Sequence, residues 1–181
     1  MPEIILVAAV ADNGVIGQQG RLPWRLKSEM AHFRAVTMGR PVVVGRKTYL
    51  SFNRRPLPGR TNIVVSRDRD FAAPGALVAP NLANALAAAR ADALRRGADA
   101  IAVAGGAEIY AATMALADRL VITRVHLRPS GDTKFPNIDP ANWREAGRSE
   151  HQAGPGDEAG FTVFEYVRIE TAAANGARAG E

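Results

Sequence analysis

Short apolar runs recur along the chain and alternate with segments of helical spacing. Continuous apolar runs at 4–11, 41–45 and 100–104 have the length of a β-strand and are typical of strands covered on both faces. Further strands are predicted at 61–67 and 120–125, and helices at 26–37, 82–95 and 108–116. This alternation predicts an α/β fold with one mostly parallel central sheet flanked by helices.

The C-terminal part of the chain departs from this alternation. A last strand is predicted at 161–169, and the Gly- and Pro-rich turn at 154–160 would let it form a hairpin with the strand at 120–125. The sheet is therefore expected to have an antiparallel C-terminal edge. Residues 170–181 contain no apolar residue larger than alanine, so they are expected to be a disordered tail after a domain of residues 1–169.

Composition limits the class of protein. With 181 residues, 47% of them apolar, the chain can bury one core, and one domain is expected. Cysteine is absent and the three histidines are scattered, so no metal site is expected. The opening apolar run is too short to span a bilayer and has no signal-peptide pattern, which favours a cytoplasmic protein without membrane contact.

The net charge of +5 fits either a nucleic acid or a small anionic ligand. The basic residues are spread singly and in pairs, without an aromatic RNA-binding pattern or zinc-finger spacing. This distribution favours a small anion and argues against nucleic acid as a partner. A basic nucleic-acid-binding module remains the alternative from another functional class.

The helix predicted at 26–37 carries an acidic residue on its apolar face. Leu26, Met30, Phe33 and Thr37 recur at helical spacing, and Glu29 shares their face. Burying an unpaired carboxylate is costly, and desolvation would raise its pKa into the range useful for proton transfer. The alternative is that Glu29 lies at the edge of the stripe with its carboxylate in water.

Three predicted strands end in groups suited to an anion. Ligands of parallel sheets bind at the carboxyl ends of the strands. If the first two of these strands are neighbours, Arg46, Ser66 and Arg67 would converge on one anionic group, and the alternative is that these are scattered surface arginines. Gly105-Gly106 would permit close approach of a pyrophosphate, although a simple tight turn is the alternative. The usual Gly-x-Gly-x-x-Gly fingerprint is absent, so a dinucleotide would be held by separate strand ends.

The segment 12–23, between the first strand and the first helix, contains three glycines and exceeds the usual length of such connections. A loop placed between a buried strand and the helix of Glu29 is predicted to act as a lid. The alternative is a plain connection.

Nine short motifs occur in an order that resembles the dihydrofolate reductase family, in its bacterial form, from about residue 4 to 167. They are Val15-Ile-Gly17, Leu22-Pro-Trp24, Glu29 with Phe33 and Thr37, Gly45-Arg-Lys-Thr48, Arg55-Pro-Leu-Pro-Gly-Arg60, Ser66, Gly105-Gly106 with Tyr110, Thr123, and Gly131-Asp-Thr-Lys-Phe-Pro136.

The resemblance implies hydride transfer from NADPH to carbon 6 of 7,8-dihydrofolate, with protonation at nitrogen 5, to give tetrahydrofolate for one-carbon metabolism. It implies that Glu29, supported by Thr123, binds the pterin, with water delivering the proton, and that Leu22 and Trp24 close the lid over the nicotinamide. The implied catalytic residues are Glu29, Trp24, Leu22 and Thr123. The implied substrate-binding residues are Val7, Ala8, Glu29, Met30, Phe33, Phe52, Arg60 and Thr123, with Arg60 pairing with the α-carboxylate of the glutamate tail.

The resemblance also implies a cofactor site. Arg46 and Arg67 near the 2′-phosphate would favour NADPH over NADH, Gly105-Gly106 would carry a cis peptide, and Asp132 would bind the lid backbone. The implied cofactor residues are Ala9, Ile16, Gly17, Gly45, Arg46, Lys47, Thr48, Ser66, Arg67, Gly105, Gly106, Ala107, Glu108, Ile109 and Tyr110.

Folate-like inhibitors are the other expected ligands, and a monomer is expected. One departure from the family pattern is Ala104 before the two glycines, where a larger aliphatic residue is frequent. The alternative enzyme is a reductase of the same fold acting on another pterin or a pyrimidine, as in riboflavin biosynthesis.

Overall fold

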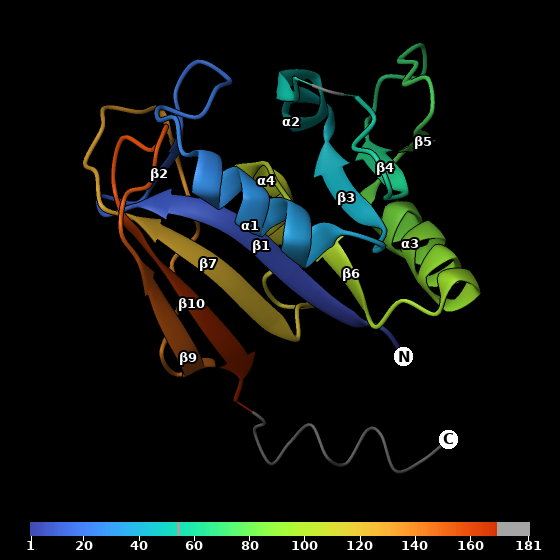
Figure 1. Ribbon diagram of the computed structural model, residues 1–181. Helices are drawn as coiled ribbons and strands as arrows, with labels where there is room; N and C mark the ends of the chain where they lie inside the picture. The colour runs from blue at the N-terminus through green and yellow to red at the C-terminus, as the bar shows by residue number, and fades with distance from the viewer. Residues whose placement is uncertain (54, 170–181) are drawn as a thin grey trace.

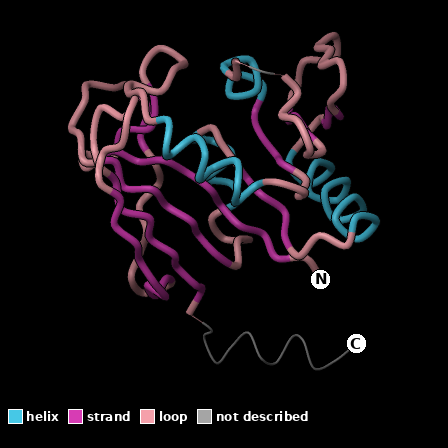
Figure 2. Tube along the Cα trace, viewed as in Figure 1, coloured by secondary structure: helices cyan, strands magenta, loops and turns pink. Residues whose placement is uncertain are grey.

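A single eight-stranded sheet organises the molecule, of which the computed structural model describes residues 1–53 and 55–169. Its strands run in the order β5-β4-β3-β6-β1-β7-β10-β9 (Figures 1 and 2). The predicted tail at 170–181 lies outside the described residues. The strands of this sheet are β1 (Glu3–Ala11), β3 (Val42–Gly45), β4 (Asn62–Val65), β5 (Leu77–Ala79), β6 (Ala100–Val103), β7 (Arg119–Val125), β9 (Trp143–His151) and β10 (Phe161–Arg168).

The pairing confirms a mostly parallel sheet with an antiparallel C-terminal edge. β1 pairs in parallel with β6 and β7, β3 with β4 and β6, and β4 with β5. β10 pairs antiparallel with β7, as predicted. The turn that precedes β10, however, connects it to β9, a strand that was not predicted. Every residue of β9 except Trp143 is exposed, because the strand lies at the edge of the sheet. Its polar sequence therefore lacks the apolar pattern that marks a strand.

Helices cover both faces of the sheet. They are α1 (Lys27–Thr37), α2 (Arg46–Ser51), α3 (Leu82–Arg96) and α4 (Ala107–Thr113). One core cluster includes the apolar side of α3 and Tyr110 of α4, whereas the cluster on Val7, Val42 and Val44 packs against Phe33 of α1 and includes Tyr49 of α2. In Figure 1, α1 lies in front of the sheet and α4 behind it. Among the described residues, no helix combines the length and apolar character required to cross a membrane.

The predicted lid contains regular structure of its own. Within it, β2 (Val15–Gly17) pairs antiparallel with β8 (Thr133–Lys134), which forms a separate two-stranded sheet. Gln18 and Arg21 exchange two backbone hydrogen bonds of 2.9 and 3.0 Å and close the loop beyond β2. The lid is therefore a strand and a tight turn docked on a segment more than a hundred residues later in the chain.

Candidate active site

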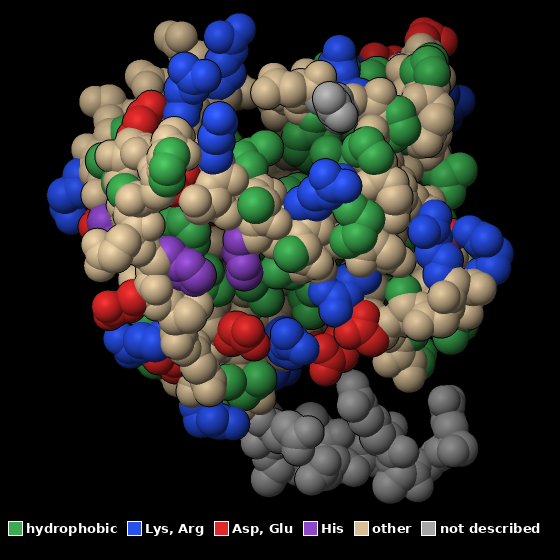
Figure 3. All heavy atoms as spheres, in the orientation of Figure 1, with side chains coloured by type: hydrophobic (Ala, Val, Ile, Leu, Met, Phe, Trp, Pro, Cys, Tyr) green, Lys and Arg blue, Asp and Glu red, His purple; other side chains and the backbone are tan. Residues whose placement is uncertain are grey.

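The candidate residues gather where the carboxyl ends of the parallel strands meet the start of α1 and the lid. The register pairs Gly45 of β3 with Val65 of β4, so the two Arg-bearing segments follow neighbouring strands as predicted. On the face shown in Figure 3, the surface is hollowed between the lid side and the α2 side, and Lys and Arg side chains stand on its rims.

Glu29 lies in the first turn of α1 and is 5% exposed. Burial raises the pKa of its carboxyl group from 4.5 to about 7, and within residues 1–53 and 55–169 no hydrogen bond or opposing charge offsets this effect. The first turn of a helix favours a carboxylate, but here desolvation outweighs that contribution. The alternative of a carboxylate in open water is therefore wrong, and Glu29 can hold or release a proton near neutral pH.

The apolar stripe expected around Glu29 is only partly present. Leu26 and Thr37 are buried and Phe33 is half-buried, but Met30 is 53% exposed. Consecutive helical residues point about 100° apart, so Glu29 and Met30 cannot both lie at the centre of one buried face. The buried face is centred toward Glu29, which leaves Met30 on the open side of the helix.

Two other polar side chains of the predicted site are buried, those of Tyr110 and Thr123. The Tyr110 hydroxyl donates to the backbone oxygen of Val7 at 2.7 Å. Burial raises the pKa of Tyr110, and the charge of Glu29 raises it further, which places the two groups within electrostatic range. Thr123 is buried in β7 next to Ala9 of β1. No hydrogen bond between Thr123 and Glu29 occurs in the described structure, so its supporting role stays a prediction.

The two lid residues assigned to catalysis have different environments. Trp24 is buried with Ala11, Val15 and Leu26 at the base of the lid. Its indole Nε1 is buried and has no hydrogen-bond partner among residues 1–53 and 55–169, which leaves a donor for water or ligand. Leu22 is 48% exposed and lies farther out on the lid.

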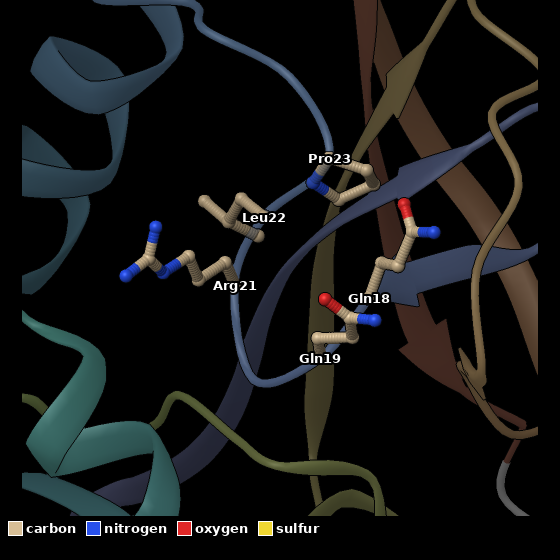
Figure 4. Close-up of a pocket in the computed structure, with 5 residues that line it drawn as sticks. All are labelled: Gln18, Gln19, Arg21, Leu22 and Pro23. Carbon is tan, nitrogen blue, oxygen red and sulfur yellow. The ribbon is translucent and has the colours of Figure 1, made fainter.

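The outer lid forms a hollow of its own. Five residues line it (Figure 4), with a volume of about 540 Å³: Gln18, Gln19, Arg21, Leu22 and Pro23. Arg21 and Leu22 extend to one side of the loop and Gln18 to the other. The hollow does not include Glu29, so it is a surface feature of the lid rather than the pterin pocket.

The predicted folate residues converge in part. Val7, Phe33 and Phe52 belong to one apolar cluster on the α1 face. The side chain of Ala8 belongs to the cluster on the opposite face, because neighbouring residues of a strand point to opposite sides. Ala8 can therefore meet a ligand on the α1 face only through its backbone.

Arg60 is held in place by two hydrogen bonds. Its Nη1 donates to Thr37 Oγ1 at 3.0 Å and its Nε donates to the backbone oxygen of Pro58 at 2.9 Å. Burial, followed by repulsion from Arg34, lowers the pKa of Arg60. The fixed guanidinium retains N–H groups for a carboxylate. Arg34 was not predicted, because only the tertiary structure brings it close to Arg60.

Glycines bring β3, α2 and α4 close together on the cofactor side. The peptide bond between Gly105 and Gly106 is cis, as predicted, and the Gly45 N–H donates to the Gly105 oxygen at 2.8 Å. A Cβ at Gly106 would lie 3.1 Å from Thr48 Oγ1, and one at Gly45 would lie 3.3 Å from Ile109 Cγ1. The three segments therefore form a cradle that can close this tightly only because these positions lack side chains.

Arg46 and Arg67 differ in their contacts. Arg46 Nη1 forms an ion pair with Asp68 Oδ2 at 2.7 Å, whereas Arg67 is exposed. Ser66 is buried, and its Oγ accepts a hydrogen bond from the Asp68 N–H at 3.2 Å. Asp68 was missed, because an acid between two arginines is expected to be an ordinary surface residue.

The remaining predicted cofactor residues surround this cradle or belong to the lid. Ile16 and Gly17 form part of β2, and Ala9 lies in β1. Ala107 and Glu108 lie in the first turn of α4. Lys47 is exposed in α2.

Asp132 binds the lid backbone, as predicted. Its Oδ2 accepts from the Gln19 N–H at 2.9 Å, and its own N–H donates to the Gly17 oxygen at 3.2 Å. A Cβ on the preceding Gly131 would lie 2.2 Å from Val15 Cγ1 and 2.7 Å from the Gly17 oxygen. Only glycine at position 131 lets the two segments approach this closely.

A distant loop caps the helix that carries Glu29. Leu26 supplies no side-chain cap, but Asp157 Oδ1 accepts from the Ser28 N–H at 3.0 Å and its Oδ2 accepts from the Gly154 N–H at 2.9 Å. The hydrogen bonds from Ser28 lower the pKa of Asp157. Asp157 thus performs the N-cap function from the loop between β9 and β10.

We expect Asp157→Ala to lower the midpoint of thermal unfolding by about 2–4 °C, because it leaves the start of α1 uncapped. Differential scanning calorimetry at pH 7 would measure the shift. Glu158→Ala is the matched control, since Glu158 makes its hydrogen bond to the Arg25 oxygen through its backbone N–H. Equal midpoints for the two variants would contradict the capping role.

Comparison with known proteins identifies relatives along nearly the whole chain. The family model described as dihydrofolate reductase matches residues 3–168. The dihydrofolate reductase of Neisseria meningitidis serogroup A is 45% identical over 152 residues, which cover 84% of this chain and 90% of that protein. That of Mycobacterium tuberculosis (strain H37Rv) is 40% identical over 149 residues, covering 80% and 86%.

A solved structure agrees with these sequence matches. Dihydrofolate reductase from Enterococcus faecalis, complexed with NADP(H) and RAB-propyl, superposes with a TM-score of 0.80 at 28% identity. The match covers 93% of this chain and 97% of that one.

Proposed function

Since the chain belongs to the dihydrofolate reductase family and reduces dihydrofolate with NADPH, we propose that Glu29 binds the pterin and controls its protonation. The observation that carries this proposal is a buried carboxyl group with a pKa of about 7 and no partner to offset its burial in the part of the chain that the structure describes. A pterin would be that partner, because its ring nitrogen N3 and its 2-amino group donate two hydrogen bonds that suit a carboxylate.

The reaction adds a hydride to carbon 6 and a proton to nitrogen 5. The glycine cradle would hold NADPH, which supplies the hydride when it is bound. Near pH 7 about half of the Glu29 carboxyl groups carry a proton in the ligand-free protein, so Glu29 can supply a proton inside the site, and water would pass it to nitrogen 5. The base of the lid, with Trp24 buried in it, excludes bulk solvent from the nicotinamide side. Trp24 Nε1 is a buried donor without a partner among the described residues, and it would orient that water.

The substrate tail would lie along α1 and end at Arg60. Phe33 and Phe52 provide apolar contacts for the central ring. The guanidinium of Arg60, already fixed by Thr37, would pair with the α-carboxylate of the glutamate. Arg34 adds positive charge beside it.

The phosphate groups of the cofactor would be held by two sets of groups. The pyrophosphate would lie against the cradle of Gly45, Thr48 and Gly105-Gly106. The 2′-phosphate would meet Arg46 and Arg67, which follow neighbouring strands.

We expect Arg67→Ala to lower the ratio of kcat/KM for NADPH to kcat/KM for NADH by about 10-fold or more, because the 2′-phosphate loses an ionic partner. Loss of cofactor absorbance with dihydrofolate present measures both rates. Arg69→Ala is the control, since Arg69 is exposed in the same loop. An unchanged ratio for Arg67→Ala would remove Arg67 from the phosphate site.

The proposal also covers the oligomeric state and the binding of inhibitors. A monomer is the oligomeric state that the proposal keeps. A relative of the same fold binds RAB-propyl together with NADP(H), which supports folate-like inhibitors as ligands here. The names of the relatives favour dihydrofolate over the pterin or pyrimidine of a riboflavin-type reductase.

A further inference from the structure

The loop after β4 is folded around the carboxylate of Asp68. Its Oδ2 accepts a hydrogen bond from Arg46 Nη1 at 2.7 Å, and its Oδ1 accepts one from the Asp70 N–H at 3.0 Å. Its own backbone N–H donates to Ser66 Oγ at 3.2 Å. Each carboxylate oxygen thus has one partner and can accept a second hydrogen bond, and these contacts hold Asp68 beside Arg46.

The guanidinium of Arg46 is fixed from two sides. Asp68 binds its Nη1, and its Cζ lies 5.9 Å from the centroid of the Phe71 ring. Arg46 is also one of the two arginines assigned to the 2′-phosphate. The structure therefore places a carboxylate directly on a cation that NADPH is expected to use.

A carboxylate and an arginine favour different groups at the 2′ position of the adenosine ribose. A guanidinium favours the 2′-phosphate of NADPH, whereas a carboxylate repels that phosphate and accepts a hydrogen bond from the free 2′-hydroxyl of NADH. Arg67 therefore favours NADPH, whereas Asp68, the next residue, favours NADH. The two lie side by side in one loop at the end of β4.

We propose that Asp68 is a specificity-determining residue that weakens the enzyme's preference for NADPH over NADH. Its carboxylate competes with the 2′-phosphate for Arg46 and offers an acceptor to the 2′-hydroxyl when the phosphate is absent. This inference rests on the proposed phosphate site at Arg46 and Arg67.

The test is Asp68→Asn, which keeps the shape of the side chain and removes its charge. We expect the ratio of kcat/KM for NADPH to kcat/KM for NADH to rise by about 10-fold at low salt, because the phosphate no longer faces a like charge. The increase should shrink as ionic strength is raised. Without turnover, 2′,5′-ADP should bind more tightly to the variant, whereas 5′-AMP should not.

Asp70→Asn is the matched control, because it makes the same change of charge two residues away in an exposed side chain. We expect its ratio to stay within about twofold of the wild type, given screening of exposed charges. Equal increases in both variants would overturn the specific role of Asp68. A fall in the ratio for Asp68→Asn would also overturn it, since Asp68 would then position Arg46 for the phosphate.

Arg46→Ala separates this inference from the site on which it rests. If Arg46→Ala and Arg67→Ala both leave the cofactor preference unchanged, the phosphate site lies elsewhere and the proposed site fails. If they lower the preference but Asp68→Asn leaves it unchanged, only the inference about Asp68 fails. Thermal unfolding of each variant shows whether it is folded.

Discussion

Replacing Glu29 with alanine is expected to slow hydride transfer to dihydrofolate about 100-fold or more at pH 7. The variant loses both the acceptor for the pterin and the proton that burial retains at neutral pH. Single-turnover loss of NADPH absorbance, with dihydrofolate saturating, measures the step without product release. A near-normal rate would remove Glu29 from the mechanism.

Two further variants identify which property of Glu29 matters. Glu29→Asp keeps the carboxyl group and should retain most of the rate, whereas Glu29→Gln keeps the shape and should lose most of it. In the wild type, kcat/KM should fall as pH rises above about 7, because Glu29 then loses its proton in the free enzyme. This decline should be absent from Glu29→Gln.

Glu29 is also expected to make the folded protein less stable as pH rises. Its pKa is about 7 in the folded state and 4.5 in the reference state, so between these values the folded protein holds a proton that the unfolded chain releases. Below about pH 4.5 the group is protonated in both states and has no effect. Above pH 7 the full penalty is present, about 3 kcal/mol of unfolding free energy.

Urea unfolding of the ligand-free protein between pH 4.5 and 8 tests this expectation. As pH rises across that range, the unfolding free energy of the wild type should fall by about 3 kcal/mol relative to that of Glu29→Gln. Glu108→Gln changes an exposed carboxylate of α4, so its unfolding free energy should depend on pH in the same way as that of the wild type. Parallel curves for Glu29→Gln would show that the carboxylate is not desolvated.

The parts of the fold that the sequence predicted are those whose residues carry their own pattern. The run that became β1 is apolar throughout because both of its faces are covered, and Glu29 stood out because it interrupted a helical stripe. β9 carries no such pattern, since its residues beyond Trp143 face water. Its place was fixed only by pairing with β10.

The predicted site residues were those of short motifs, whereas the missed ones act through partners far apart in sequence. Asp68 is significant because β3 and β4 are neighbours, which brings Arg46 to it from 22 residues away. Arg34 matters through Arg60, and Asp157 through Ser28. No local spacing encodes these pairs, because the tertiary structure creates them.

The cap that Asp157 places on α1 has a consequence for the order of assembly during synthesis. Ser28 and Asp157 are separated by 129 residues in the sequence. The loop that carries Asp157 can form only after β10 has been synthesised, because this loop connects β9 to β10. Domains with many such distant contacts complete their structure late. A nascent chain halted before residue 157 would hold the helix of Glu29 without its cap, so the site would be finished only as the last strand left the ribosome.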